Sequence, residues 1–451
     1  MLNAPLSFLS DDLVGYLVEH VANLTYWEEA LNNLSLADPV FTSFCQKYLF
    51  RTLALGGRRG TRSRISKKLT QVKNILDDNP LFANQVRKVE LRIEHKQNAW
   101  LLQNPSGHDP LRTDAVDALT FISVFRLLAN SPMPPHELHL NVAIYPIEDP
   151  VLLVGRLSQS FFSQTLTILH LTECQNVPLT LFLICSRLKD VLIDSVEAAK
   201  EGYDQYPEDQ CFGRESPALE RFNYRDSHAI VKQMITPPPR FQTPVVLWSK
   251  LRVLTLCPHE ANEMALLQPI LDAACPTLEE LFLTNLHVGP DKQLPLTGLV
   301  NLSRLSRLRV FSLYAKIKYD APGSAVLRDI NVVLGTIPVS NCITNLFFDL
   351  CILGEREHPL RGCLDEDWEG ICNEAIRISF GKPLELDFEI VVSGKFERGR
   401  GKKNELYVSI MEKTTSLSDH PNICTHFWNP TYWDHGLGPF PRGQVRGRCR
   451  R

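Results

Sequence analysis

One short pattern of leucines recurs along the middle of the chain, and it constrains the fold more than any other feature. Its clearest copy, Leu166–Cys174, reads L-x-x-L-x-L-x-x-C, the strand signature of a leucine-rich repeat. Three further good copies begin at Leu251, Leu278 and Leu308. Looser copies begin at Val86, Leu138, Leu188, Ile343 and Leu384. Each copy predicts a short strand whose alternate side chains point into a core.

Segments with helical periodicity lie between these strands. Residues 115–128 and 264–275 each place apolar side chains at three- and four-residue intervals. Strands and helices that alternate about every 22 to 35 residues predict an α/β solenoid with a parallel sheet on its concave face. We assign residues 80–354 to this irregular leucine-rich-repeat solenoid. The alternative is an ordinary α/β domain with chance leucine spacing, which four good copies disfavour.

The first fifty residues predict three short helices. Ser10 is a suitable N-cap, and Asp11 follows it in the first turn, where the helix dipole favours negative charge. Leu13, Leu17 and Val21 then recur every four residues and predict a single apolar face.

The other two of these helices begin at recognisable signals. The second begins near Glu28, and the third begins after Asp38, with Pro39 at its first helical position and its end near Leu53. About 40 residues with so many apolar side chains make a unit that is marginal by itself. The unit must therefore be completed by the following domain or by a partner.

This N-terminal stretch resembles an F-box. The resemblance rests on Phe8–Leu13, Leu34–Ala37, Phe44 and Tyr48–Leu53. It covers roughly residues 6–53, and its ending LFRTL is especially similar to F-box-like proteins of fungi. F-boxes usually carry Pro directly after the first Leu, where this chain has Ser10, so the strength of partner binding is in question. The alternative is a three-helix cap that covers the end of the following domain.

An F-box followed by degenerate leucine-rich repeats implies the substrate-recognition adaptor of a Skp1-cullin-F-box ubiquitin ligase. Residues 1–55 would dock onto a Skp1-type linker protein and through it onto a cullin, and the repeats would present an unknown protein substrate. The ubiquitin chemistry belongs to other subunits, so we expect no catalytic residues and no cofactor. The alternative is a leucine-rich-repeat scaffold without a ubiquitin role, whose N-terminal helices serve as a cap.

The expected docking residues are apolar positions of the three helices, some of which must instead pack the module internally. They are Leu9, Leu13, Leu17, Leu31, Leu34, Leu36, Val40 and Phe44. The sequence does not separate the docking residues from the internal ones.

Residues 195–247 interrupt the repeat. They are polar and Pro-rich, with Pro237, Pro238 and Pro239 in a row, and they predict a long loop. The loop also carries aromatic residues, which would either contact a partner or pack over the solenoid.

The C-terminal region, 355–451, predicts a modified end of the solenoid. Two strands, 384–390 and 406–411, are expected to flank a basic hairpin loop at 394–403, and an Arg-rich tail follows. Basic, Gly-rich segments can bind RNA or acidic partners, but a solvated loop and a frayed tail are the simpler interpretation.

Motifs for catalysis or nucleotide binding are missing from the sequence. It contains no Gly-x-Gly-x-x-Gly, no Gly-x-Ser-x-Gly and no His-Glu-x-x-His. His420, Cys424, His426 and His435 gather metal-binding residue types, but their spacing is not a common zinc pattern. We therefore expect no metal site there.

Charge and hydropathy restrict the partners and the cellular location that can be expected for this protein. Lys plus Arg is 48 and Asp plus Glu is 51, too balanced to indicate a nucleic-acid partner or a membrane surface. No apolar run reaches the roughly 18 residues of a membrane helix, and the N-terminus lacks the basic and apolar regions of a signal peptide. We therefore expect a cytoplasmic or nuclear protein with no membrane partner.

Overall fold

The fold is described from a computed structural model of the 451-residue chain. The residues it describes are 10–24, 26–56, 62–93, 113–142, 164–199, 215–237, 244–258, 261–285, 295–318, 326–354, 366–394 and 408–428. The chain divides into two compact units, Met1–Pro217 and Ala218–Arg451.

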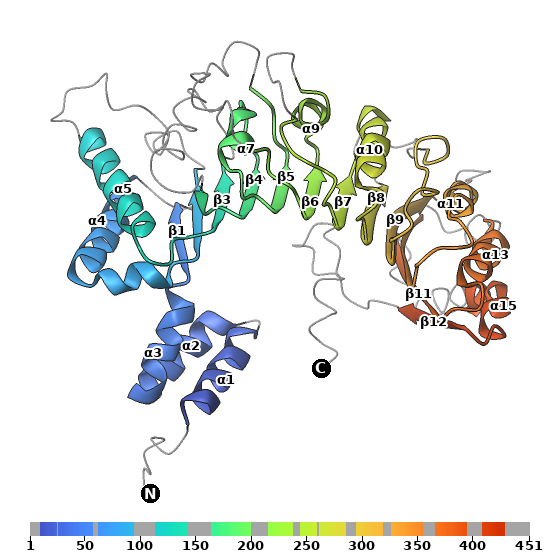
Figure 1. Ribbon diagram of the computed structural model, residues 1–451. Coiled ribbons are helices and arrows are strands. Elements are labelled where there is room, and N and C mark those ends of the chain that lie inside the picture. Colours follow the sequence, from blue (N-terminus) through green and yellow to red (C-terminus); the bar gives the residue numbers. More distant parts are fainter. Residues whose placement is uncertain are drawn as a thin grey trace, which may run out of the picture. The chain divides into compact units, whose positions relative to one another are not determined.

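The first unit begins with three helices and continues as a parallel sheet (Figure 1). Its elements are α1 (Asp11–Ala22), α2 (Trp27–Ala37), α3 (Pro39–Leu49), β1 (Thr52–Gly56), α4 (Arg62–Asp78), the 3-10 helix η2 (Pro80–Gln85), β2 (Lys88–Arg92), α5 (Thr113–Ala129), β3 (Glu137–Asn141), β4 (Ile168–Thr172), α7 (Thr180–Ile184) and β5 (Asp190–Asp194). Strands β1 to β5 pair in chain order, and every pairing is parallel.

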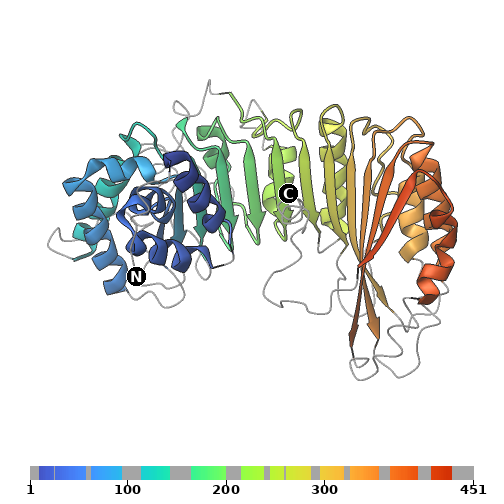
Figure 2. The same ribbon diagram turned by 90° about the horizontal axis from the view of Figure 1, so that it is seen from below.

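The second unit is also a series of parallel strands alternating with helices, and some of its strands are longer. Its elements are β6 (Arg221–Arg225), α9 (His228–Ile235), β7 (Val253–Cys257), α10 (Ala261–Ala274), β8 (Glu280–Asn285), β9 (Val310–Lys318), α11 (Val326–Gly335), β10 (Asn345–Gly354), α13 (Trp368–Ser379), β11 (Leu384–Gly394), α15 (Thr415–Ser418) and β12 (Ile423–Trp428). Strands β6 to β12 also pair in chain order and in parallel. Strands β9, β10 and β11 have 9, 10 and 11 residues, and Figure 2 shows how far they extend.

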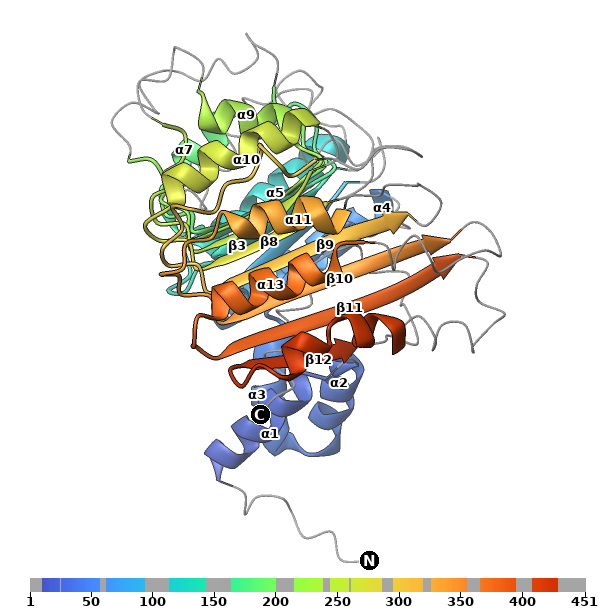
Figure 3. The same cartoon turned by 90° about the vertical axis from the view of Figure 1, so that its right-hand side faces the viewer.

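Buried and half-buried side chains alternate along the strands, and this alternation shows which face of each sheet packs into the core. In β4, Leu169 and Leu171 are buried, whereas the residues between them are half-buried on the opposite face. In the second unit, helices α9, α10, α11 and α13 lie along one face of the sheet (Figure 3). The buried leucines of these strands therefore lie on the face that the helices cover, as the leucine pattern predicts.

Aromatic rings continue this core to the last strand. The rings of Phe348 on β10, Phe388 on β11 and Phe427 on β12 stack in series, with centroids 5.6 and 5.2 Å apart. Trp368 of α13 is buried against Phe388, 6.0 Å between ring centroids. These contacts fix β11 and β12 side by side and direct their polar residues to the other face of the sheet.

The expected α/β architecture is confirmed as a series of parallel strands and helices. All nine strands predicted from leucine copies are present, as β2 to β5 and β7 to β11. The helices predicted at 115–128 and 264–275 are α5 and α10.

Three sequence expectations about individual segments are wrong. The third helix ends at Leu49, and residues 52–56 form β1, because Thr52–Gly56 pairs with β2 instead of extending the helix. The long loop expected at 195–247 contains β6 and α9, since Phe222 and Tyr224 alternate with polar residues and are buried as strand residues.

The third of these errors concerns the C-terminal region. Residues 408–413 are helical, so the strand expected at 406–411 is wrong, and β11 pairs in parallel with β10 and β12, not in a hairpin. Residues 395–407, with most of the basic loop, and the Arg-rich tail lie outside the described residues.

No helix in the described part of the chain combines the length and the apolar character needed to cross a membrane.

Candidate docking surface

Local signals in the sequence set the three N-terminal helices. Ser10 caps α1, and its hydroxyl accepts a hydrogen bond from the Leu13 amide at 3.4 Å. Asp38 caps α3 by accepting from the Val40 amide at 2.9 Å, with Pro39 at the first helical position. Both predicted caps are therefore confirmed. The side-chain acceptors satisfy backbone donors that have no partner within the helix.

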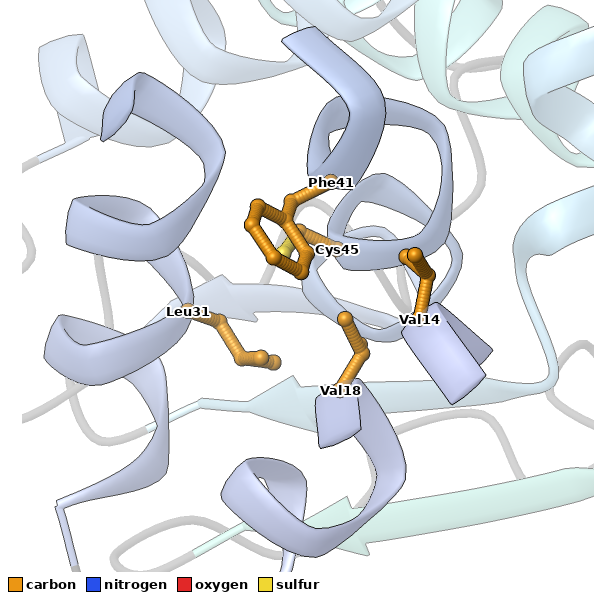
Figure 4. Packing of buried hydrophobic residues seen from close by; sticks show 5 residues of the cluster. All are labelled: Val14, Val18, Leu31, Phe41 and Cys45. Carbon is orange, nitrogen blue, oxygen red and sulfur yellow. The ribbon is translucent and has the colours of Figure 1, made fainter. Parts of the chain in front are cut away.

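A small core closes the three-helix module from within. Val14 and Val18 of α1, Leu31 of α2, and Phe41 and Cys45 of α3 are buried together (Figure 4). The inward residues of α1 are therefore Val14 and Val18, each one position after Leu13 and Leu17 of the apolar face that the sequence predicts. The two valines have the same four-residue spacing as the leucines, so periodicity does not distinguish the faces.

The leucines of α1 point outward instead. Leu13, Tyr16 and Leu17 are 45%, 68% and 39% exposed, and their three- and four-residue spacing makes them neighbours on one helix face. We call these three residues the α1 stripe. Leu24, Tyr26 and Leu36 are exposed apolar residues of the same module. Among the described residues of the first unit, the repeat strands and helices therefore leave the α1 stripe uncovered.

The structure separates the eight expected docking residues into three groups. Leu13, Leu17 and Leu36 are exposed. Leu34, Val40 and Phe44 are half-buried and pack against the module's core. Leu31 is fully buried, so it holds the module together and is not available to a partner. Leu9 lies outside the described residues.

Three exposed residues of the module were not expected from the sequence: Tyr16, Leu24 and Tyr26. The spacing of Tyr16, three residues after Leu13, could have placed it on the same face. Leu24 and Tyr26 lie between helices, where periodicity gives no signal.

The base of the module is attached to the first repeat. The backbone carbonyl of Arg51 accepts hydrogen bonds from the amides of Arg87 and Lys88, at 2.8 and 3.1 Å. The ring of Phe50 packs against that of Phe82, with centroids 4.9 Å apart. The module is therefore attached just after the C-terminal end of α3, through residues other than those of the α1 stripe.

Acidic residues accompany the α1 stripe. Asp11, Asp12 and Glu19 are exposed on the same helix, and Glu28 and Glu29 begin α2. Burial, together with the negative charge of Glu19, raises the pKa of Tyr48, and burial raises the pKa of the Cys45 thiol. Both groups therefore stay neutral at neutral pH and add no charge to the module.

A second cluster, of charged and imidazole groups, lies on the sheet face opposite the buried leucines. His139 and His170 occupy paired positions on β3 and β4, with ring centroids 4.0 Å apart. His139 Nε2 lies 2.6 Å from Glu137 Oε1, and Lys88 Nζ lies 3.5 Å from the same oxygen. We call Lys88, Glu137, His139 and His170 the β3–β4 network.

Burial and mutual charge shift the pKa values of this network. Burial, reinforced by repulsion from His139, lowers the pKa of His170 to about 3. Burial alone would raise the pKa of Glu137, but the hydrogen bond with His139 and the charge of Lys88 outweigh it and hold this pKa at about 2. At neutral pH the network therefore combines an ionised carboxylate with a neutral His170.

Comparison with protein families and curated proteins identified no relative of this chain. No protein-family model matches the sequence, and no curated protein is significantly similar to it. Any functional conclusion therefore rests on the residues themselves.

Proposed function

We propose that the protein is the substrate-recognition adaptor of a Skp1-cullin-F-box type ubiquitin ligase. The observation that carries the proposal is the exposed α1 stripe on a module whose core is already closed by other residues. A cap would turn such residues toward the domain it covers. Grouped apolar residues that remain exposed are typical of a protein-binding surface.

The partner surface follows from the chemistry of the stripe. Leu13, Tyr16 and Leu17 offer an apolar centre, and tyrosine is enriched where binding energy concentrates. Exposed carboxylates are present on α1 and at the start of α2. We therefore propose that a Skp1-type linker binds with an apolar groove bordered by basic residues, which would also speed association.

The mechanism is positioning. The three-helix module would hold the chain to the ligase, and the repeat units would hold a protein substrate. Two binding surfaces on one chain raise the effective concentration of substrate lysines near the ubiquitin-carrying enzyme. No residue of this chain takes part in ubiquitin transfer on this proposal.

The experiment is co-purification of the full chain with a Skp1-type linker, using charge substitutions in the α1 stripe. We expect the wild-type chain to elute with the linker, and Leu13→Asp combined with Leu17→Asp to abolish co-elution. Both side chains are exposed, so the double variant keeps its fold. The matched control is Ile75→Asp combined with Leu119→Asp, which changes two exposed residues of α4 and α5. Equal binding by both double variants would refute the proposal.

A leucine-rich-repeat scaffold capped by its N-terminal helices is the second candidate. The observation that favours it is the attachment of the module to the first repeat, through the Arg51 carbonyl and the pairing of β1 with β2. A wild-type chain that stays monodisperse and never co-elutes with the linker would favour this scaffold.

A further inference from the structure

Four metal-binding residue types share one face of the last two strands. Glu385 and Asp387 alternate on β11, and Cys424 and His426 alternate on β12. The register pairs Glu385 with Cys424 and Asp387 with His426. Paired residues of neighbouring parallel strands point to the same side of a sheet. The four side chains therefore form a two-by-two group, which we call the β11–β12 group.

Three residues of the group lie close enough together to approach one metal ion, and the fourth, Cys424, lies beside His426. Cys424 Sγ lies 3.3 Å from His426 Nε2, and this nitrogen lies 3.8 Å from Glu385 Oε1. Ligand atoms of Glu385, Asp387 and His426 all lie within 4.8 Å of one another. Bonds of about 2.0–2.3 Å at tetrahedral angles place neighbouring ligand atoms about 3.3–3.6 Å apart. Cys424 is near His426 but is not within 4.8 Å of all three other residues, so its side chain must rotate toward Glu385 for all four donors to reach one ion.

A second layer of hydrogen bonds orients the carboxylate. Asn345 on β10 donates to Glu385 Oε2 at 2.7 Å, and Thr344 donates to the Asn345 side-chain oxygen at 2.8 Å. The other oxygen, Oε1, is the one near His426. Partners of this kind fix the orientation of metal ligands in known sites.

Access and rigidity also suit a metal site. Cys424 is exposed, and the side chains of Glu385 and His426 are each about one-third exposed, so an ion can reach them. On the opposite face, the stacked rings of Phe388 and Phe427 hold the two strands together. The donors are thus carried on paired strands and not on a loop.

The β3–β4 network has a similar composition but different surroundings. Glu137 Oε1, the oxygen that faces His139, also faces the Lys88 ammonium group at 3.5 Å. A fixed positive charge at the same oxygen opposes a second cation, and that network has no thiol. The β11–β12 group combines thiol, imidazole and carboxylate donors, which suit Zn²⁺.

We propose that the β11–β12 group binds one zinc ion, with Cys424, His426, Glu385 and Asp387 as ligands. This differs from the sequence expectation of no metal site, because two of the donors come from a strand about 40 residues earlier in the chain. His420 is not part of the group, and His435 lies outside the described residues. Bound zinc would tie the final strand to the sheet and stabilise that end of the second unit.

The experiment is a titration of the metal-free full chain with Zn²⁺ in competition with a coloured chelator, followed by titration with Co²⁺. We expect one zinc ion per chain and, with cobalt, a near-ultraviolet charge-transfer band from a thiolate ligand. Cys424→Ser should remove that band and weaken zinc binding by more than the roughly 10- to 100-fold typical of losing a second-layer partner. Asn345→Leu, which changes such a partner, should weaken binding within that range.

Cys342→Ser is the matched control, because it removes an exposed thiol outside the group. It should leave both the stoichiometry and the cobalt band unchanged. Circular dichroism of each variant checks that the fold persists. The proposal is overturned if the wild-type chain takes up no stoichiometric zinc, if the cobalt complex lacks the thiolate band, or if Cys424→Ser binds zinc as well as Cys342→Ser does.

Discussion

Two leucines of α2 have opposite environments, one in the interior of the N-terminal module and one on its surface. Leu31 is fully buried in a core of five residues, whereas Leu36 is 85% exposed. Both occupy one helix, and Leu→Ala changes helix propensity equally little at either position. Leu31→Ala leaves a cavity that should cost about 3 kcal/mol, within the range for buried leucines. Leu36→Ala should cost less than about 0.5 kcal/mol.

Native-state hydrogen exchange of the full chain measures this difference in stability within helices α1 to α3. A loss of about 3 kcal/mol corresponds to roughly a hundredfold faster exchange of the protected amides of α1 to α3, since 1.4 kcal/mol is a factor of ten. Leu36→Ala should change these rates less than about threefold. If Leu36→Ala accelerated exchange as much as Leu31→Ala, Leu36 would be packed against other parts of the chain. The reasoning that the module presents free apolar residues would then be refuted.

Three further predictions concern stability. Burial lowers the pKa of His170 from its ordinary value of 6.5 to about 3 in the folded chain. The stabilising effect of the neutral ring is therefore complete above about pH 6.5 and is lost as the pH falls toward 3. From this residue alone the chain should be about 2 kcal/mol less stable at pH 5 than at pH 8, and His170→Asn should remove that part of the pH dependence in urea unfolding. Gly56 has φ +98°, and an added Cβ would lie 1.8 Å from the Arg92 carbonyl oxygen, so Gly56→Ala should lower the free energy of unfolding by about 3 kcal/mol. Gly298→Ala is the control, because Gly298 also has a positive φ but an added Cβ would meet no atom within 4 Å. It should lower the free energy of unfolding by only about 1 kcal/mol. Equal losses of stability in the two variants would contradict the clash at Gly56. Asp329 accepts hydrogen bonds from the amides of Leu296 and Thr297 at 2.6 and 2.7 Å. Asp329→Ala should therefore lower the free energy of unfolding by about 2–4 kcal/mol. An unchanged thermal midpoint would show that these bonds add nothing to stability.

Leucine spacing predicted most of the sheet because each repeat strand needs buried residues at fixed intervals. Strands β1, β6 and β12 were not predicted. Strand β1 has alternating buried leucines, Leu53 and Leu55, but residues up to Leu53 were expected to continue the third helix. Strands β6 and β12 contain no leucine. In β6 the buried positions are Phe222 and Tyr224, and in β12 Ile423 is buried while Cys424 and His426 occupy the other face. Burial of aromatic residues at alternate positions forms the same strand, but a leucine pattern does not detect it.

The candidate surfaces were less predictable for a geometric reason. On α1, a pair of leucines and a pair of valines have identical spacing, so either pair could face the interior. Val14 and Val18 are the buried pair because they pack against α2 and α3. In the β11–β12 group, the pairing of two strands brings Glu385 beside Cys424. Neither arrangement can be read from local sequence, since both depend on residues that are distant along the chain.

The central claim is that the α1 stripe binds a Skp1-type linker, and hydrogen exchange of the complex tests it most directly. The full chain is compared with and without the purified linker, peptide by peptide. We predict slower exchange in α1 and around Tyr26, with unchanged exchange in the strands of the second unit. Unchanged exchange throughout α1 to α3 at saturating linker would contradict the claim, as would slower exchange confined to the repeat strands.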